Sequence, residues 1–439
     1  MTINFITLTN MKRKLLFGER MLYGDGTSPF NVIIPFKIKG NINEADLKFA
    51  LFRIQKKHPW LSAAIRFDED KKPWFVTNRT ENFKVPIRIV ERLDDQTWEE
   101  ESAQEWKTLF DATAAPLFRV VWVKGNLVSE FLLVFHHCLC DGTAALSILT
   151  ELLQLLDDPD SHIGSEIPIM GIEDVIPGKI LNSYRNRTKN SIIGKMATLA
   201  LWIIPLKKIA VERKRDFMLH WKFDEELTSQ IVQFCKANQF TVNTLLSAVV
   251  LMAFKNVRKE KAFNKISLPV DIRNFNPLIK KDNIFAFGLM IVLSLLPEKD
   301  FLSQVKTLQA VVDTKSAKLN PYSLMMMMES CHPALQNFTN LLKYGKSSND
   351  CMFSNLGRIA IEHQYQHFEV ETIFSPSVMG PLGNTTTMIV STYRNQMDFT
   401  FVASEGYVPF VEAEAIKEQV ISILKSQILQ PIEILTATA

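Results

Sequence analysis

The chain has 439 residues, of which 47% are hydrophobic and 22% are charged, a balance typical of a folded globular protein and not of a disordered one. This length exceeds what one hydrophobic core usually supports, so two domains are expected. The formal net charge of +3 is too small to indicate nucleic acid as a partner.

The five cysteines are scattered along the chain and odd in number. No two of them have metal-ligand spacing with supporting histidines, so we expect reduced thiols in a cytoplasmic protein. Residues 1–16 lack a continuous apolar stretch followed by a small-residue cleavage site, so no signal peptide is expected.

Strand-like and helix-like stretches alternate through the first part of the chain, which we expect to form an N-terminal subdomain of residues 1–156. A helix is predicted over residues 43–57, because leucine and isoleucine recur there at helical spacing, Asn43 can cap its start and His58-Pro59 stops it. The other predicted elements are helices at 18–23, 99–110 and 143–156 and strands at 31–36, 63–67, 73–76, 86–90, 117–123 and 131–135.

Residues 157–215 are rich in proline, aspartate and basic residues and are predicted to form a loop-like crossover between two subdomains. This crossover contains an apolar decamer, Met196–Pro205, flanked by basic residues and too short to span a bilayer. We favour a helix packed on the fold. The alternative is a helix lying on an anionic membrane surface, and the basic cluster could instead meet the phosphates of coenzyme A or of a carrier-protein arm.

The last part, residues 216–439, again mixes the two kinds of element and is predicted to form a C-terminal subdomain. Helices are predicted at 225–238, 242–255, 302–319 and 412–424, and strands at 265–270, 289–296, 388–392 and 397–403. Mixed strands and helices in both parts indicate an α/β or α+β protein and argue against a helical bundle or a β-sandwich.

The most informative motif is His136-His137-Cys138-Leu139-Cys140-Asp141-Gly142, which follows the apolar strand at 131–135. An imidazole at a strand terminus beside a tight turn is held by a rigid scaffold, as a general base requires. Because successive strand residues point to opposite faces, only one of the two histidines can face a shared cavity. We interpret His136 as structural and His137 as the candidate base, since neutral imidazole can accept a proton near neutral pH.

Asp141 has two interpretations. Its carboxylate could orient His137 as in a catalytic triad, or it could anchor the turn without touching the imidazole, which we favour because Asp-Gly is common in turns. A metal site made by His136, His137 and Asp141 is disfavoured, because adjacent strand residues diverge.

Residues 136–142 resemble the HHxxxDG signature of the chloramphenicol acetyltransferase-like acyltransferase superfamily. This superfamily includes the condensation domains of nonribosomal peptide synthetases, alcohol acetyltransferases and polyketide-associated acyltransferases. Further motifs that resemble those of the superfamily are His58-Pro59-Trp60-Leu61, Phe110-Asp111 with Pro116-Leu117-Phe118-Arg119, Pro269-Val270-Asp271-Ile272-Arg273 and Ser354-Asn355-Leu356-Gly357.

The resemblance implies two chloramphenicol acetyltransferase-like subdomains, each a mixed sheet with helices, that meet at a central tunnel. By position, His137 takes the role of the base, and Asp141 is structural and pairs with Arg273. Gly142 leaves room for the thioester of the donor. Ser354 or Asn355 could line the substrate site near the developing oxyanion, and the alternative is a strand-end turn before Gly357.

The implied activity is transfer of an acyl group from a thioester, acyl-CoA or a phosphopantetheinyl acyl-carrier protein, to an alcohol or amine acceptor. The donor is then a substrate, and neither a bound cofactor nor a metal is expected. A cluster of methionines, Met325–Met328 with Met290 and Met352, could line an acyl tunnel, although ordinary core filling is favoured. The alternatives are an amide-forming condensation enzyme acting on carrier-bound substrates and a non-catalytic binding module. A membrane contact of the basic-flanked helix would favour a lipid-like acceptor.

Overall fold

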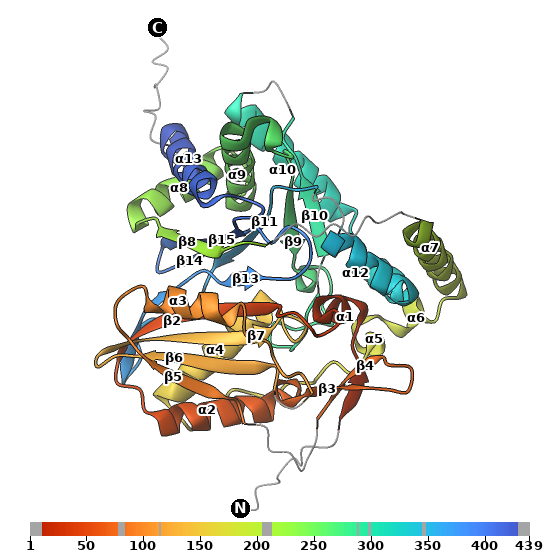
Figure 1. The fold of residues 1–439 in the computed structure, drawn as a ribbon, viewed down its shortest axis with the longest axis horizontal. Coiled ribbons are helices and arrows are strands. Elements are labelled where there is room, and N and C mark those ends of the chain that lie inside the picture. The colour runs from red at the N-terminus through yellow and green to blue at the C-terminus, as the bar shows by residue number, and fades with distance from the viewer. Residues whose placement is uncertain are drawn as a thin grey trace, which may run out of the picture.

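The computed structural model describes residues 11–77, 84–113, 116–203, 213–287, 289–296, 300–344 and 348–428. Two six-stranded sheets lie one above the other, each covered by helices, and a small three-stranded sheet lies at one side (Figure 1). This mixed arrangement confirms the predicted α/β class and excludes a bundle or a simple sandwich.

The N-terminal sheet has the strand order β12-β2-β7-β6-β5, with β13 also paired to β2. Its strands are β2 (Asn31–Gly40), β5 (Ile87–Glu91), β6 (Phe118–Lys124), β7 (Val128–His136), β12 (Phe368–Ile373) and β13 (Ser377–Met379). Strand β7 lies at the centre, between helices α3 (Thr97–Glu105) and α4 (Gly142–Asp157), and both helices contact it. This double cover explains why the residues of β7 form a nearly continuous apolar run.

Two helices of this part begin at side-chain caps. Asn43 accepts a hydrogen bond from the Ala45 amide (2.7 Å) at the start of α2 (Glu44–Lys57), as predicted. Asp141 accepts one from the Ala144 amide (3.0 Å) at the start of α4. The first helix, α1, spans Phe17–Tyr23, and the small sheet has the order β1-β4-β3, from Lys12–Lys14, Pro73–Val76 and Ala64–Phe67.

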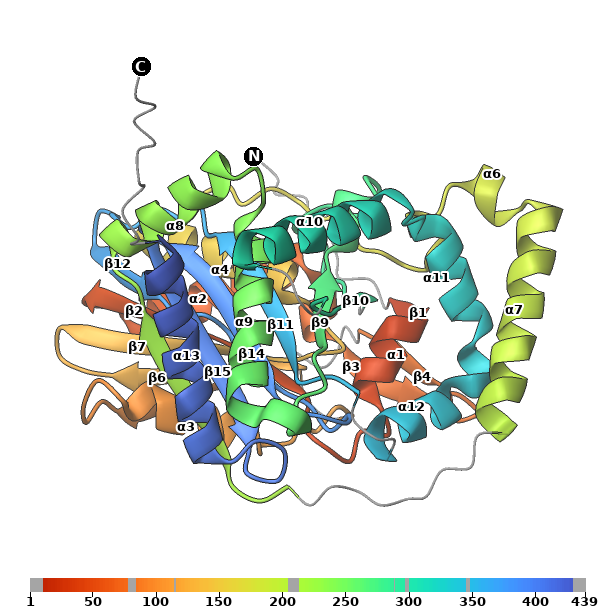
Figure 2. The same cartoon turned by 90° about the horizontal axis from the view of Figure 1, so that it is seen from above.

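The crossover is more helical than predicted. It contains α5 (Ile172–Val175), α6 (Gly178–Leu181) and the twenty-residue α7 (Tyr184–Ile203). Helix α7 stands at the edge of the molecule, where it packs against α11 (Pro321–Ser330) and contacts α12 (Leu335–Tyr344) (Figures 1 and 2). The loop prediction was wrong over residues 184–195, where a tertiary contact with α11 supports a helix whose sequence has weak amphipathic character as a whole. The packed helix favoured for the apolar decamer is present over its described residues, 196–203, as the end of α7.

The C-terminal sheet has the order β10-β9-β11-β14-β15-β8. Its strands are β8 (Asp216–Lys222), β9 (Ile266–Val270), β10 (Leu289–Leu293), β11 (Cys351–Arg358), β14 (Thr387–Tyr393) and β15 (Gln396–Ser404). Four helices of this part, α8 (Glu225–Ala237), α9 (Val242–Arg258), α10 (Phe301–Ala317) and α13 (Phe410–Ile428), lie on one side of the sheet (Figure 1).

Strands β12 and β13 come from the last part of the chain, yet both pair with β2 of the N-terminal sheet. The polypeptide therefore crosses back between the sheets after residue 358 and returns to the C-terminal sheet at β14. The boundary predicted at residue 216 does not separate the two sheets completely.

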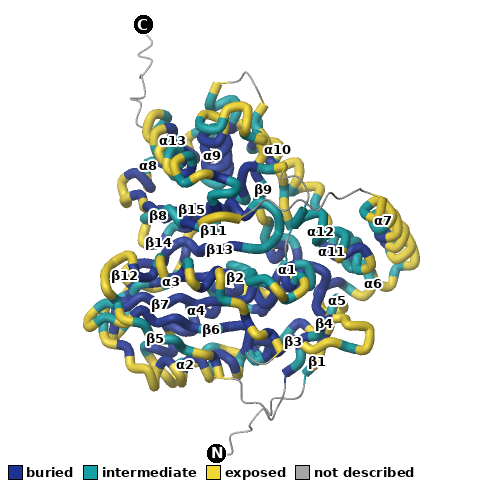
Figure 3. Tube along the Cα trace, viewed as in Figure 1, coloured by how far each residue is buried: buried dark blue, intermediate teal, exposed yellow. Residues whose placement is uncertain are grey.

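The buried residues form two large apolar clusters, one for each six-stranded sheet, seen as the dark regions of Figure 3. A third, smaller cluster lies beside them and includes Ile272, Phe285 and Met325. Within the described ranges no single helix is long and apolar enough to cross a membrane; only α8 and α9 taken together, bent by 105°, meet that test.

Candidate functional site

The candidate site is the turn between β7 and α4. Strand β7 ends at His136, and the His137 amide donates to the Phe30 carbonyl (2.7 Å) at the start of the neighbouring strand. The Asp141 amide donates to the Phe285 carbonyl (3.2 Å), which belongs to a segment 144 residues further along the chain. Backbone contacts on both sides therefore hold the turn in place.

One of the two nitrogens of the His137 imidazole forms a hydrogen bond within the protein. Its Nδ1 lies 3.2 Å from the Cys140 carbonyl, which can only accept, so Nδ1 carries the hydrogen and Nε2 carries the lone pair. Within the described part of the chain, Nε2 forms no hydrogen bond to another residue. The Phe30 ring meets the imidazole edge to face, with centroids 5.1 Å apart. Burial lowers the pKa of His137 below 6.5, so the ring is neutral at neutral pH.

His136 points into the N-terminal core instead. It is 2% exposed, and its Nδ1 accepts a hydrogen bond from the Cys138 amide (3.2 Å). The rings of Tyr23 and Phe110 pack against it at 5.8 and 6.1 Å. Burial lowers the pKa of His136 to about 3, which leaves it uncharged. These contacts agree with its interpretation as a structural residue.

Asp141 contacts Arg273, and the predicted ion pair between them is confirmed. Arg273 lies in the short turn after β9 and also donates to the carbonyls of Lys280 (3.1 Å) and Asn283 (3.2 Å). Burial opposes the charge of Arg273, but the attraction of Asp141 and Asp271 outweighs it and raises its pKa. Since Asp141 caps α4 and binds Arg273, its described hydrogen bonds support the anchoring interpretation over the triad.

Strand β11 passes close to the start of α4. A side-chain carbon added at Gly142 would lie 3.1 Å from Leu356, so glycine leaves this approach free. The Asn355 side-chain oxygen accepts from the Gly357 amide (2.8 Å), and Gly357 has a φ of +70°. This contact lies inside β11, at an irregularity of its pairing with β14, and not in the strand-end turn given as the alternative. In the described coordinates no hydrogen bond joins Ser354 or Asn355 to His137, so their substrate contacts stay a prediction.

A buried ionic network beside the site was not predicted from the sequence. His58 is completely buried and bridges two carboxylates, Glu151 through Nε2 (2.8 Å) and Glu166 through Nδ1 (2.5 Å). Burial opposes the charge of His58, but hydrogen bonds and attraction from both carboxylates raise its pKa to about 9. Glu151 was the available signal, because it is a charged residue on the apolar face of α4.

This network reaches the loop that holds Arg273. Glu166 accepts hydrogen bonds from the Ile284 amide (2.9 Å) and from the Asn283 side chain (3.4 Å). Lys57 pairs with Glu151 (2.6 Å) and with Asp282 (3.1 Å). The residues that tie α2 to α4 therefore also position the loop whose Asn283 carbonyl accepts from Arg273.

The methionines of the predicted cluster differ in burial. Met325 and Met326 are buried in the small apolar cluster with Ile272 and Phe285, which supports core filling, whereas Met290 is 44% exposed on the edge strand β10. Among the residues that the structure describes, no group of three histidine, cysteine, aspartate or glutamate side chains could hold a metal ion.

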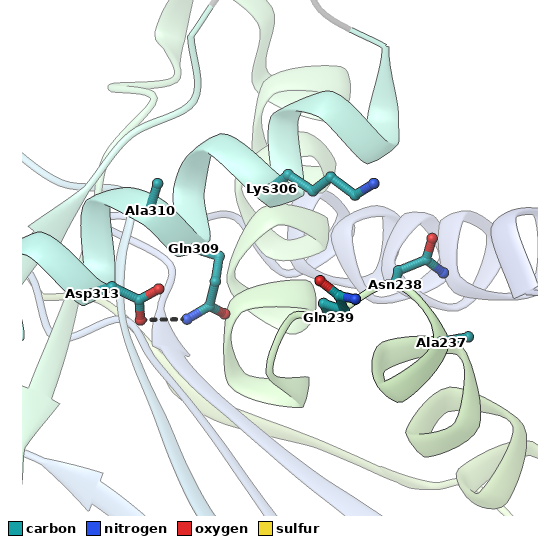
Figure 4. A pocket seen from close by; sticks show the side chains of 7 residues that line it. All are labelled: Ala237, Asn238, Gln239, Lys306, Gln309, Ala310 and Asp313. Carbon is teal, nitrogen blue, oxygen red and sulfur yellow. Dashed lines mark hydrogen bonds between the residues drawn. The ribbon is translucent and has the colours of Figure 1, made fainter.

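A polar hollow of about 410 Å³ lies between the α8–α9 turn and α10 (Figure 4). Its Gln309 accepts from the Thr241 amide (2.9 Å) and donates to Asp313 (2.8 Å), so this side chain holds the start of α9. The residues that line the hollow include none from the His137 turn and no histidine or cysteine. We assign it no part in the chemistry.

Residues 2–157 match the family model of the condensation domain. Gramicidin S synthase 2 of Brevibacillus brevis is 21% identical over 259 residues, 54% of this chain and 6% of that protein. Gramicidin S synthase 2 of Aneurinibacillus migulanus is 22% identical over 259 residues, again 54% of this chain and 6% of that protein. The chain thus spans only a small fraction of the length of these relatives.

Solved structures share the fold over nearly the whole chain. Polyketide synthase associated protein 5 from Mycobacterium tuberculosis has a TM-score of 0.67 at 14% identity, covering 95% of this chain and all of that one. The trichothecene 15-O-acetyltransferase TRI3 of Fusarium sporotrichioides has a TM-score of 0.69 at 11% identity, covering 94% and 95%. The condensation domain of the monacolin K polyketide synthase MokA has a TM-score of 0.64 at 15% identity, covering 96% and 99%.

Proposed function

Since the chain has the fold of the condensation-domain-like acyltransferases and residues 2–157 match the condensation domain, we propose that it transfers an acyl group from a thioester to a hydroxyl or amine, with His137 as the general base. The observation that carries this proposal is the state of one imidazole. His137 is neutral, its Nδ1 is occupied by the Cys140 carbonyl and its Nε2 keeps the lone pair.

The proposed reaction is a direct transfer. Nε2 of His137 accepts the proton of the acceptor's hydroxyl or amine while the oxygen or nitrogen of the acceptor forms a bond to the acyl carbon. The carbon–sulfur bond then breaks, and the proton returns to the departing thiolate. No acyl-enzyme is required, so the rate depends mainly on how the two substrates are positioned, which can contribute about 7–11 kcal/mol.

The donor is acyl-CoA or an acyl group on a carrier protein. The solved structures that resemble this chain over nearly its full length include an O-acetyltransferase, which favours a hydroxyl acceptor. The sequence relatives include two gramicidin S synthases, and the matching family model is the condensation domain, which supports a second candidate, amide formation between carrier-bound substrates. The two candidates use the same base and differ in the two substrates.

The test is release of thiol from a panel of acyl-CoAs, short to long, with alcohols or amines as acceptors and with wild type compared with His137→Ala. We expect release that requires an acceptor and falls about a hundredfold or more in the variant, because general-base catalysis contributes about 10²–10⁴-fold. A parallel panel of acyl groups loaded on phosphopantetheinyl carrier protein separates the two candidates.

His363→Ala is the matched control, because His363 is exposed and lies away from the turn in sequence. This variant should keep full activity. Equal release by wild type and His137→Ala would remove His137 as the base. Folded protein that releases no thiol from either kind of donor would contradict the proposed activity and favour a binding role for this fold.

A further inference from the structure

Helix α7 presents an apolar stripe to solvent. Four residues spaced by four, three and four positions lie on one face, and all are more than half exposed: Ile192 (53%), Met196 (65%), Leu199 (56%) and Ile203 (64%). Trp202 lies beside this stripe and is 76% exposed. The eleven residue steps from Ile192 to Ile203 give the stripe a length of about 16 Å. The surfaces of soluble proteins rarely expose such a continuous row of apolar side chains unless a partner covers it.

The opposite face of α7 is the one that packs on the protein. Asn190 and Gly194 are its buried residues, and a side-chain carbon added at Gly194 would lie 2.4 Å from the Ser330 carbonyl of α11. The helix thus meets α11 through a small residue and is held close to it. The stripe consequently faces away from the body of the molecule, at the edge where α7 stands (Figures 1 and 2).

The charges of α7 are all positive. Arg185, Arg187, Lys189 and Lys195 are exposed, and the helix contains no aspartate or glutamate. None of these four cations forms an ion pair with another described residue. The sequence continues with Lys207 and Lys208, which lie outside the described residues together with the end of the apolar decamer.

This combination identifies the chemistry of the partner. Exposed cations beside an apolar stripe with an adjoining tryptophan suit an anionic lipid surface, where headgroups contact the cations and the apolar side chains enter the interface. A second copy of the chain is a poorer partner, because pairing two stripes would bring eight cations together without a counter-charge.

We propose that α7 is a peripheral membrane-docking helix, which lies flat on an anionic bilayer with Ile192, Met196, Leu199, Trp202 and Ile203 in the interface. The proposal does not rest on the acyltransferase activity. It provides a means of bringing the protein to lipid-like substrates.

The test is sedimentation of the full chain with phosphatidylcholine vesicles that contain or lack phosphatidylglycerol. We expect binding to the anionic vesicles that weakens as salt is raised. The double variant Leu199→Glu/Trp202→Glu should bind about tenfold or more weakly, because it places two charges in the interface. Charge reversal at Arg185 and Lys189 should reduce binding to anionic vesicles while leaving the weak binding to neutral ones unchanged.

Two matched variants serve as controls. Leu127→Glu/Val411→Glu changes two residues that are equally exposed (73% and 75%) but lie elsewhere, and Lys236→Glu/Lys318→Glu reverses two other exposed cations. Both should bind vesicles like wild type. The proposal is overturned if wild type does not sediment with anionic vesicles, or if Leu199→Glu/Trp202→Glu binds equally well. Light scattering that shows a dimer in wild type and a monomer in that variant would reassign the stripe to self-association.

Discussion

At the residue scale, one backbone contact decides which nitrogen of His137 can accept a proton. The Cys140 carbonyl accepts a hydrogen bond from Nδ1. The hydrogen bond from the His137 amide to the Phe30 carbonyl fixes the backbone on the other side. A side-chain carboxylate is not needed for this orientation. The base is therefore positioned by the turn itself, and the nearby Asp141 acts on it only through its charge.

This arrangement predicts the pH dependence of acyl transfer. Because burial lowers the pKa of His137 from 6.5, the imidazole stays in its neutral, active form at pH 6.5 and above. We expect kcat/KM to be level near neutral pH and to fall only below pH 6.5, as His137 becomes protonated. Asp141→Asn removes a charge that favours protonation, so it should move the acid limb to lower pH. An acid limb above pH 6.5 would contradict the assignment.

The Asp141–Arg273 pair is expected to matter for stability. Arg273 is largely buried, and Asp141→Ala would leave its charge without its main partner while also removing the cap of α4. We expect a loss of about 3–5 kcal/mol in the free energy of unfolding, measured with urea. Asp141→Asn should cost less, since asparagine can still cap the helix.

A double-mutant cycle isolates the pair. The combination of Asp141→Asn with Arg273→Met should destabilise the protein by less than the sum of the two single changes, because neither charge is then left alone. Simple additivity would show that the two side chains do not interact in solution.

At the element scale, His58 connects helices α2 and α4 to the loop that holds Arg273. Its contacts with Glu151 and Glu166 join segments that are far apart in the sequence. The sequence indicates His58 as the residue that ends α2 and as part of a motif that resembles the superfamily, but it does not indicate its partners. Its protonation depends on two carboxylates that reach it from more than ninety residues away.

The network predicts a loss of stability at high pH. The folded-state pKa of His58 is about 9, above the ordinary 6.5, so its contribution is fully present below pH 6.5 and is lost as the pH rises through 9. The shift corresponds to about 3 kcal/mol. The stability difference between wild type and His58→Gln should therefore be large near pH 7 and shrink by about that amount near pH 10. A difference that does not change with pH would show that His58 is neutral in the folded protein.

At the scale of the whole molecule, the last part of the chain contributes strands to both six-stranded sheets. Strands β12 and β13 complete the edge of the N-terminal sheet beside β2, and Lys222 of β8 contacts Thr372 of β12. The first part of the chain consequently depends on the last part for one edge of its sheet.

This dependence predicts the behaviour of a fragment. Residues 1–215 alone would leave the edge of β2 unpaired and would expose apolar residues that β12 and β13 cover. We expect the fragment to lack a cooperative thermal transition by circular dichroism, and to become soluble and folded when residues 216–439 are supplied. A fragment that melts cooperatively by itself would show that the N-terminal subdomain is independent.

The local elements and the motif at the site could be predicted from the sequence. Periodicity, capping and turn residues are properties of neighbouring positions, so α2, α4 and β7 were predicted close to their observed bounds. The Asp141–Arg273 contact was also foreseen, but only through the resemblance to a family, because 132 residues separate the two.

The remaining features are visible only in the folded protein. Three features depend on contacts between distant segments: β12 joins the N-terminal sheet, α7 packs on α11, and His58 is charged. Strand pairing, burial and pKa values are set by what the fold brings together, and local sequence patterns contain no direct record of it.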